Sequence, residues 1–163
     1  MTATESGTLI VTTPSDREVV ATRVFEAPRE LVWKAYTEPE HLQQWMLGPA
    51  GWTMPVCEMD LRPGGAYRFV WRKEDGTEMT ITGTVREVEA PERMVSTEEW
   101  GGDWPEALNT IEFTEDGGKT TLTVTVLYPT KDARDAAVRT GMTDGMSTSF
   151  DLLEEHLRSM ASG

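Results

Sequence analysis

The sequence predicts an α+β fold in which a curved antiparallel sheet wraps around a long C-terminal helix. Two observations carry this prediction. Between Met54 and Tyr128 apolar residues recur with a period of two, which is typical of strands with one buried face. Over residues 131–160 they recur every three or four positions, as on one face of an amphipathic helix. A twisted sheet with one apolar face needs cover, and this last helix can supply it.

The N-terminal part predicts a hairpin followed by two short helices. Two runs of β-forming residues flank 14–16, where Pro-Ser-Asp favours a turn, and the second run ends by Pro28. The stretch RELVWKAYTEPEHLQQW then predicts helices over 29–37 and 39–45. They are separate helices because Pro39 can begin a helix but cannot lie inside one.

The middle of the chain predicts six strands in an antiparallel meander. Turn signals rich in glycine separate them, as in Pro-Gly-Gly, Asp-Gly and Asp-Gly-Gly. The predicted strands are 54–61, 65–73, 78–89, 93–100, 108–115 and 120–128. Gly83 lies within one of them, where glycine costs stability unless the backbone bends or another group comes close. We therefore expect the sheet to curve sharply at Gly83.

The C-terminal apolar stripe predicts one long helix over residues 131–160. Its members are Val138, Met142, Met146, Phe150, Leu153, Leu157 and Met160. Gly141 and Gly145 lie within the same stretch, and we expect them to bend or loosen the helix.

Composition and charge restrict the classes of function. At 163 residues, with 38% hydrophobic and 26% charged side chains, the chain predicts one globular domain over 1–163 with an ordered core at about 8–160. It contains no apolar run long enough to insert into a membrane. The net charge of −13 argues against a nucleic acid partner. A single cysteine and an N-terminus without signal-peptide features predict a cytoplasmic location.

Four stretches of the chain carry a resemblance to a known family. In order, they are VFEAPRELVWKAYTEPEHLQQW, CEMDLRPGGAYRFVW, GTVREVEAPERMV and GMTDGMSTSFDLLEEHL. Together they resemble the homologues of the activator of heat shock protein 90 ATPase, within the START-like (SRPBCC) helix-grip superfamily. The resemblance implies a helix-grip fold with a cavity between sheet and helix, which in the wider superfamily holds lipids, sterols, polyketides or other apolar molecules. The family usually has Gly-Trp where this chain has Gly145-Met146.

The sequence pattern predicts no catalytic residue, metal site or cofactor. His41 and His156 lack a second His, Cys or Asp at metal-ligand spacing, so each is interpreted as a solvated or capping histidine. Cys57 alternates with apolar residues on a strand and is expected to be an inert buried thiol. Without a recognisable pair of nucleophile and base, the sequence favours binding over catalysis.

One pair of carboxylates raises a separate question. Glu98 and Glu99 are neighbours on one strand, so one of them should point toward the helix. Burial there would raise the pKa of the carboxyl group or demand a partner, and Arg68 or Arg72 could be that partner across strands. A solvated carboxylate is the alternative interpretation.

Aromatic residues point to the proposed ligand. Tyr67, Phe69 and Trp71 share one face of a strand, where they either fill a core or line a cavity. We expect a hydrophobic or aromatic small molecule to bind there, with Glu98 or Asn109 as an orienting polar group. The candidate lining residues are Trp45, Trp52, Tyr67, Phe69, Trp71, Met142, Met146 and Phe150, with Trp45 and Trp52 at the mouth.

Two other functions stay open. One is a protein-interaction module of the heat shock protein ATPase activator type, as the family resemblance implies. The other is a cyclase- or hydrolase-like enzyme, which needs an acid–base pair that only Glu98, Glu99 or Tyr128 could supply. A homodimer is compatible with either reading.

Overall fold

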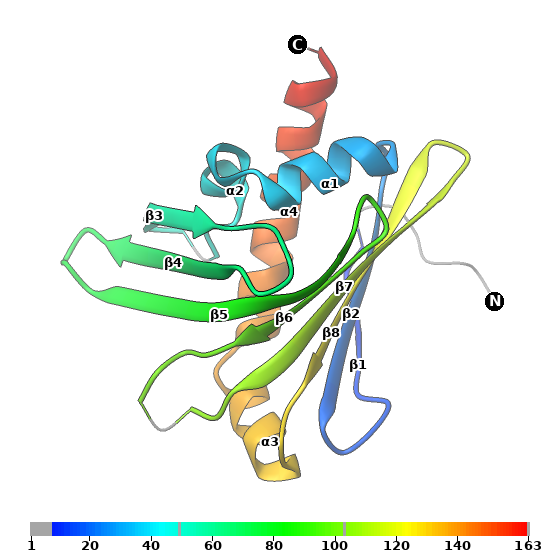
Figure 1. Ribbon diagram of the computed structural model, residues 1–163. Coiled ribbons are helices and arrows are strands. Elements are labelled where there is room, and N and C mark those ends of the chain that lie inside the picture. Colours follow the sequence, from blue (N-terminus) through cyan, green and yellow to red (C-terminus); the bar gives the residue numbers. More distant parts are fainter. Residues whose placement is uncertain (1–7, 49, 103, 163) are drawn as a thin grey trace.

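The computed structural model describes residues 8–48, 50–102 and 104–162, and its elements follow the predicted order (Figure 1). Eight strands form one antiparallel sheet in the order β1-β2-β8-β7-β6-β5-β4-β3. The strands are β1 (Ile10–Thr12), β2 (Glu18–Phe25), β3 (Trp52–Met59), β4 (Ala66–Lys73), β5 (Glu78–Glu89), β6 (Arg93–Glu98), β7 (Ala107–Asp116) and β8 (Lys119–Leu127). The helices are α1 (Arg29–Thr37), α2 (Pro39–Trp45), α3 (Lys131–Arg139) and α4 (Met142–Ser162).

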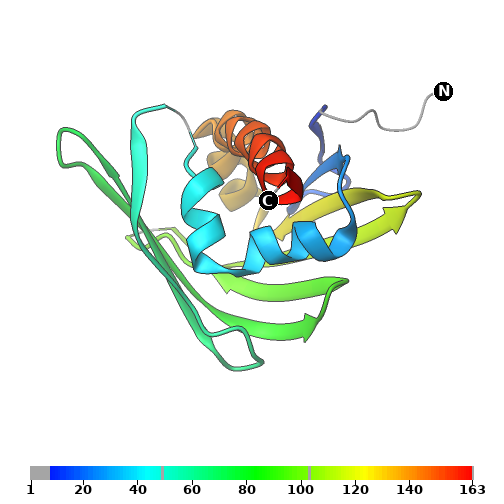
Figure 2. The same cartoon turned by 90° about the horizontal axis from the view of Figure 1, so that it is seen from above.

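The sheet curls around α4, which lies on its concave side (Figures 1 and 2). Seen from above, the strands form a trough, and α1 and α2 lie across the end of it beside α4 (Figure 2). The predicted α+β helix-grip fold is therefore confirmed. No helix in the described part of the chain is long and apolar enough to cross a membrane.

The strand register identifies the side chains on the concave face, because directly paired residues share a face of the sheet. On β6 and β7, Ser96 pairs with Asn109 and Glu98 with Ala107. Ser96 also pairs with Val85 on β5. The same face continues through β4, where the predicted aromatic strand presents Tyr67, Phe69 and Trp71, all three buried.

The prediction of a single helix over 131–160 is wrong. The stretch forms two helices, α3 and α4, which are separated at Thr140 and Gly141. Gly141 has a φ of +85°, a left-handed conformation that strains residues with a side chain and ends α3. As a result Val138, on α3, leaves the predicted apolar stripe and is 40% exposed.

Glycine is required at position 83 because other groups come close to its backbone. Close approach is one of the two reasons predicted from the sequence for a glycine within a strand. A Cβ atom at this position would collide with the Thr97 carbonyl oxygen and with the Tyr67 ring. The ladder between β5 and β6 is open here: the Thr84 amide donates to Thr97 Oγ1 at 2.8 Å, and the Tyr67 hydroxyl donates to the Thr97 carbonyl at 2.5 Å. β5 itself is long and curved through this region (Figure 1).

Candidate functional site

The part of the concave face formed by β2 and β8, which we call the Arg23 half, is closed by packing and by ion pairs to α4. Arg23 is 1% exposed, and its Nη1 lies 2.7 Å from Asp151 Oδ1 while its Nη2 lies 3.6 Å from Glu154 Oε2. The guanidinium also covers the Phe25 ring at 5.1 Å. Phe25 in turn makes an edge-to-face contact with Phe150 of α4, with ring centroids 5.8 Å apart.

Sequence reasoning missed Arg23, although one signal was available. Val19, Ala21 and Phe25 occupy alternate positions of β2 and are buried, which puts Arg23 on the same inward face. A charged residue in that register predicts an acidic partner on the helix that covers the sheet.

The part formed by β4, β5, β6 and the start of β7, which we call the Glu98 half, has a different character. Glu98 points to the concave side and Glu99 is exposed, which confirms that one of the two carboxylates faces inward. Trp100 Nε1 donates a 2.8 Å hydrogen bond to Glu98 Oε1. The Trp100 ring stacks on Trp71, with centroids 5.7 Å apart and planes at 22°. Trp100 is 39% exposed and therefore stands at the rim.

The predicted arginine partners of the inward carboxylate are wrong. Arg68 faces Glu58 on the outer side of the sheet at 4.0 Å, and Arg72 binds Glu78 at 2.6 Å. Both arginines lie on the face opposite the aromatic strand residues, because successive strand residues alternate. Glu98 therefore has an indole as its hydrogen-bond donor and no arginine beside it among the described residues.

The surroundings of Glu98 disfavour its charged form relative to an exposed carboxyl group. Burial raises the pKa of the Glu98 carboxyl group, and the Trp100 hydrogen bond only partly opposes this. Burial also raises the pKa of the hydroxyls of Tyr36, Tyr67 and Tyr128, and the negative charge of Glu98 raises each of them further. Three tyrosines from α1, β4 and the end of β8 thus lie within electrostatic reach of one carboxyl group.

Asn109 adds a second polar group to the Glu98 half. Its Oδ1 atom is buried and has no hydrogen-bond partner among the described residues. The paired Ser96 is also buried on this face. Leaving a buried acceptor without a donor costs about 1–3 kcal/mol. Both polar residues chosen from the sequence, Glu98 and Asn109, therefore lie on the concave face.

The three aromatic residues of β4 form a continuous row. The Phe69 centroid lies 5.1 Å from that of Tyr67 and 6.1 Å from that of Trp71. Trp71 Nε1 donates to the Met46 carbonyl, in the segment after α2, at 2.7 Å. The row therefore faces the helices, and its two ends are fixed by hydrogen bonds at Tyr67 and Trp71.

The tryptophans predicted at the mouth lie in two different environments. Trp45 is fully buried and donates its Nε1 hydrogen to the Ala35 carbonyl at 2.9 Å, so its placement at a mouth is wrong. The period of α2 gives the reason, because Leu42 and Trp45 share the helix face that is buried. Trp52 is half-buried at the start of β3, where Lys73 Nζ lies 5.0 Å from its ring.

The three residues predicted on the last helix divide between the two halves. The Tyr128 hydroxyl lies 3.5 Å from Met142 Sδ, which brings Met142 toward the tyrosines around Glu98. Met146 is half-buried and packs against the core. Phe150 is buried and contacts Phe25, so it belongs to the Arg23 half.

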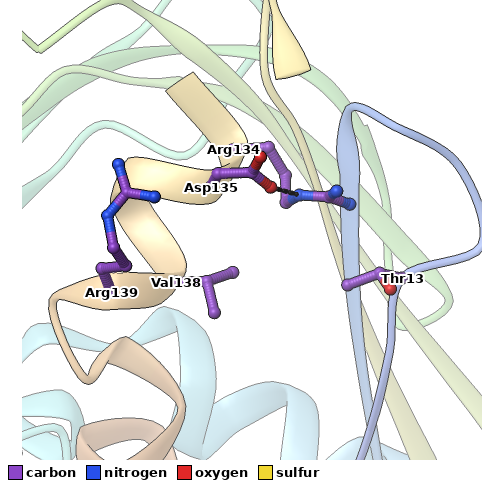
Figure 3. Close-up of a pocket in the computed structure, with 5 residues that line it drawn as sticks. All are labelled: Thr13, Arg134, Asp135, Val138 and Arg139. Carbon is purple, nitrogen blue, oxygen red and sulfur yellow. Dashed lines mark hydrogen bonds and ion pairs between the residues drawn. The ribbon is translucent and has the colours of Figure 1, made fainter. Parts of the chain in front are cut away.

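A surface hollow of about 290 Å³ lies between α3 and the segment after β1 (Figure 3). Its lining residues are Thr13, Arg134, Asp135, Val138 and Arg139. Arg134 Nε donates to Asp135 at 2.8 Å, and its Nη1 donates to the carbonyls of Ser15 and Glu18 at 2.8 and 3.3 Å. Since these contacts engage the guanidinium, the hollow leaves little of it for an anionic ligand.

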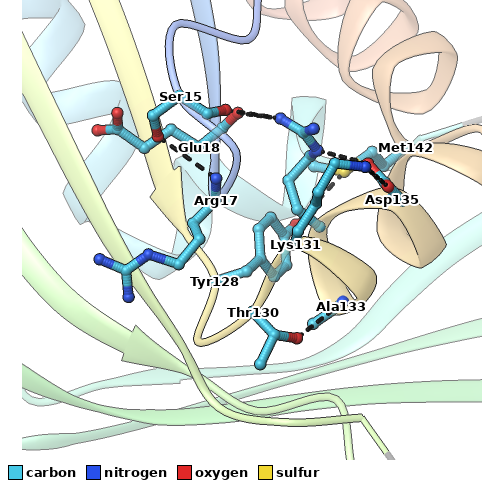
Figure 4. Close-up of polar contacts among 10 residues, drawn as sticks. Ser15, Arg17, Glu18, Tyr128, Thr130, Lys131, Ala133, Asp135 and Met142 are labelled. Atoms are coloured by element: carbon cyan, nitrogen blue, oxygen red, sulfur yellow. Dashed lines mark hydrogen bonds and ion pairs between the residues drawn. The ribbon is translucent and has the colours of Figure 1, made fainter.

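Other contacts of this region start α3 and hold it in place (Figure 4). Thr130 Oγ1 accepts a 3.1 Å hydrogen bond from the Ala133 amide, which caps the helix. Lys131 Nζ binds Asp135 Oδ2 at 2.8 Å, one turn further along. The region joins α3 to the β1–β2 hairpin, which is a structural role.

A second hollow, of about 410 Å³, lies on the convex face of the sheet, which is the face away from α4. It is lined by Glu58, Ala66, Tyr67, Arg68, Thr82, Gly83, Thr84 and Glu99. Arg68 pairs with both Glu58 and Thr82, and these side chains point outward. Neither hollow lies between the sheet and α4.

Comparisons with known proteins give a family and a set of similar structures. The family model for Activator of Hsp90 ATPase homolog 1-like protein matches residues 26–158. The search of curated proteins returned no match. A solved structure from Rhodobacter sphaeroides is 30% identical with a TM-score of 0.87, covering 93% of this chain and 99% of that chain.

Two further solved structures show the same fold. A protein from Nitrosomonas europaea is 26% identical with a TM-score of 0.82, over 93% of this chain and 100% of that chain. An AHSA1-like protein from Aeromonas hydrophila is 21% identical with a TM-score of 0.69, over 87% of this chain and 94% of that chain.

Proposed function

The chain belongs to the family of Activator of Hsp90 ATPase homolog 1-like proteins, and we propose that the Glu98 half of its concave face binds a hydrophobic or aromatic small molecule. The observation that carries the proposal is the inward carboxyl group of Glu98, whose own pKa is raised by burial and whose charge raises the pKa of three tyrosine hydroxyls. A core that serves only for packing gains nothing from such a group, because burying it costs free energy.

The surroundings of Glu98 suit a flat apolar ligand. Phe69, Trp71 and Trp100 offer aromatic surface, which binds rings through stacked and edge-to-face contacts. Met142 and Met146 of α4 are half-buried, and methionine adapts to apolar partners of varied shape. The support for a binding space here is this composition, together with the unfilled hydrogen-bonding capacity of the polar groups.

The polar groups favour a ligand that donates a hydrogen bond. Among the residues that the structure describes, Asn109 Oδ1 is a buried acceptor without a donor, and Glu98 Oε1 accepts from the rim residue Trp100 alone. A ligand with a hydroxyl or amine group would satisfy such an acceptor when it binds. An apolar body with one donor is therefore the proposed ligand type.

Calorimetry with a matched pair of ligands tests the proposal. We expect 2-naphthol to bind with a dissociation constant about tenfold lower than that of 2-methylnaphthalene, since one satisfied buried acceptor corresponds to about 1.4 kcal/mol. Replacing Asn109 by Leu or Glu98 by Leu should reduce this preference, while Glu99→Leu, on the exposed neighbour, should leave it unchanged. Equal affinity for both ligands in all four proteins, or binding by neither ligand, would contradict the proposal.

Catalysis is a second candidate, supported by the same carboxyl group. A carboxyl with a raised pKa beside tyrosine hydroxyls is a suitable proton donor or acceptor. Mass spectrometry of the recovered ligand separates the two functions, because a binding protein returns the ligand unchanged. Conversion that is lost in Glu98→Gln would favour the enzyme.

A protein-interaction function has its own supporting observation. Met79, Trp100 and Trp104 are exposed by 44%, 39% and 41%, which is unusual for such large apolar side chains. The family name suggests a chaperone ATPase as the partner. Stimulation of heat shock protein 90 ATPase by the wild type, and its loss in Trp104→Ala, would favour this alternative over ligand binding.

A further inference from the structure

Two histidines that are far apart in the sequence meet in the structure. His41 of α2 and His156 of α4 lie 115 positions apart, yet His41 Nδ1 is 2.9 Å from His156 Nε2. Their ring centroids are 5.1 Å apart. The sequence pattern, which led us to interpret each as a solvated or capping histidine, did not predict this contact, because spacing along one chain cannot report a contact between two helices.

The other nitrogen of His41 faces carboxylates. His41 Nε2 lies 3.6 Å from Glu38 Oε1. One ligand atom each from Glu38, Glu40 and His41 lies within 4.8 Å of the other two. We propose that these three residues bind a first-row divalent metal ion such as Zn²⁺, with His41 Nε2 and the two carboxylates as ligands and His156 as the residue that orients the His41 ring.

The local backbone explains why these side chains converge. Glu38 is the residue that precedes α2, Pro39 begins the helix, and Glu40 and His41 belong to its first turn. Proline fixes its own φ and restricts the residue before it, so this segment has few alternative conformations. Residues three apart on a helix lie on one side, which brings Glu38 and His41 together.

The donor set fits a borderline metal ion. Zn²⁺ binds imidazole nitrogen and carboxylate oxygen at about 2.0–2.2 Å and accepts water in a remaining position. Two carboxylates neutralise the charge of a divalent ion. Glu40 is exposed and Glu38 is half-buried, so rotation of the Glu40 side chain can bring its oxygen closer at small cost.

His156 supplies what a ligating histidine normally requires. A metal-bound imidazole usually donates its second ring N–H to an acceptor, which fixes both its tautomer and its orientation. With the proton of His41 on Nδ1, the acceptor is His156 Nε2, and Nε2 of His41 is left free toward the carboxylates. The site thus links the start of α2 to α4.

Calorimetric titration of Zn²⁺ into the full chain tests the proposal, in a Cys57→Ala background that removes the only thiol. We expect one ion to bind per chain. His41→Gln and Glu40→Gln should each weaken binding at least about tenfold, as loss of a ligand does, while Glu74→Gln in the distant β4–β5 turn should not. Equal binding by His41→Gln and the background protein, or many weak sites lost together in high salt, would overturn the proposal.

Two variants of His156 test its assigned role. His156→Leu removes the acceptor and should weaken Zn²⁺ binding about tenfold, whereas His156→Gln keeps a carbonyl acceptor and should retain most of it. If Gln weakens binding as much as Leu, His156 is itself a ligand and the proposed ligand set is wrong. Thermal unfolding in a chelator serves as the folding control, since each variant should unfold within a few degrees of the background protein.

Discussion

The two halves of the concave face use the same sheet and the same helix in opposite ways. In the Arg23 half, a buried charge has two acidic partners on α4, and the phenylalanines contact each other edge to face. In the described part of the Glu98 half, the Glu98 carboxyl group accepts from an indole at the rim, and the Asn109 amide oxygen has no hydrogen-bond partner. The difference teaches that buried charge alone does not identify a site. Arg23 Nε and Asn109 Oδ1 are both buried without a hydrogen-bond partner among the described residues, so unfilled hydrogen-bonding capacity occurs in both halves. What distinguishes the Glu98 half is a carboxyl group that faces inward with an indole donor in place of a cationic partner.

The largest expected difference comes from one phenylalanine in each half. Phe150→Ala in the Arg23 half should lower the free energy of unfolding by about 3–5 kcal/mol, because a closely packed core leaves a cavity. Phe69→Ala in the Glu98 half should cost noticeably less if its neighbours already leave space. Urea denaturation measures both, and equal losses would show that the Glu98 half is a filled core.

Removing the buried guanidinium tests the Arg23 half by itself. Arg23→Ala should cost about 2–3 kcal/mol, from the lost volume and the lost ion pairs. This is below the usual cost of breaking a buried pair because the Asp151 side chain is 68% exposed and stays hydrated. Arg23→Met, which keeps the volume, should recover most of the loss, and failure to do so would assign the stability to charge rather than packing.

Gly83 tests how closely the strands of the Glu98 half approach one another. Gly83→Ala forces a methyl group against the Thr97 carbonyl and the Tyr67 ring, and we expect a loss of about 1–3 kcal/mol. Gly145→Ala, in the first half of α4, is the control and should be neutral or stabilising, because alanine favours helix. A neutral Gly83→Ala would mean that Tyr67 moves freely away from Gly83.

The smallest expected effect is a pH dependence from Glu98. Because its pKa is raised in the folded protein, stability is complete at low pH and falls as pH rises through the folded pKa. Glu98→Gln should therefore match the wild type near about pH 4 and exceed it near about pH 8, by about 1.4 kcal/mol for each unit of pKa shift. Parallel stability curves for the two proteins would contradict a raised pKa of Glu98 in the folded protein.

The sequence predicted the fold more completely than the site, and particular residues show why. Alternation and turn residues placed every strand, and Pro39 separated α1 from α2 at the observed position. The break at Gly141 was underestimated because an apolar stripe does not show whether glycine bends a helix or ends it. The partners of Glu98 and of Arg23, and the meeting of His41 with His156, depend on which distant elements pack together, which local patterns do not encode.

The central claim is that the Glu98 half holds a ligand, and binding of the neutral dye Nile red to a filled variant tests it most directly. Met146→Trp adds bulk at a half-buried position of α4 that packs against the core, and Val138→Trp, at an exposed position of α3, is its control. The account predicts that the wild type and Val138→Trp bind one dye, and that Met146→Trp binds it at least about tenfold more weakly while remaining as stable as the wild type. No dye binding by the wild type, together with a loss of about 1–3 kcal/mol in Met146→Trp from overpacking, would contradict it.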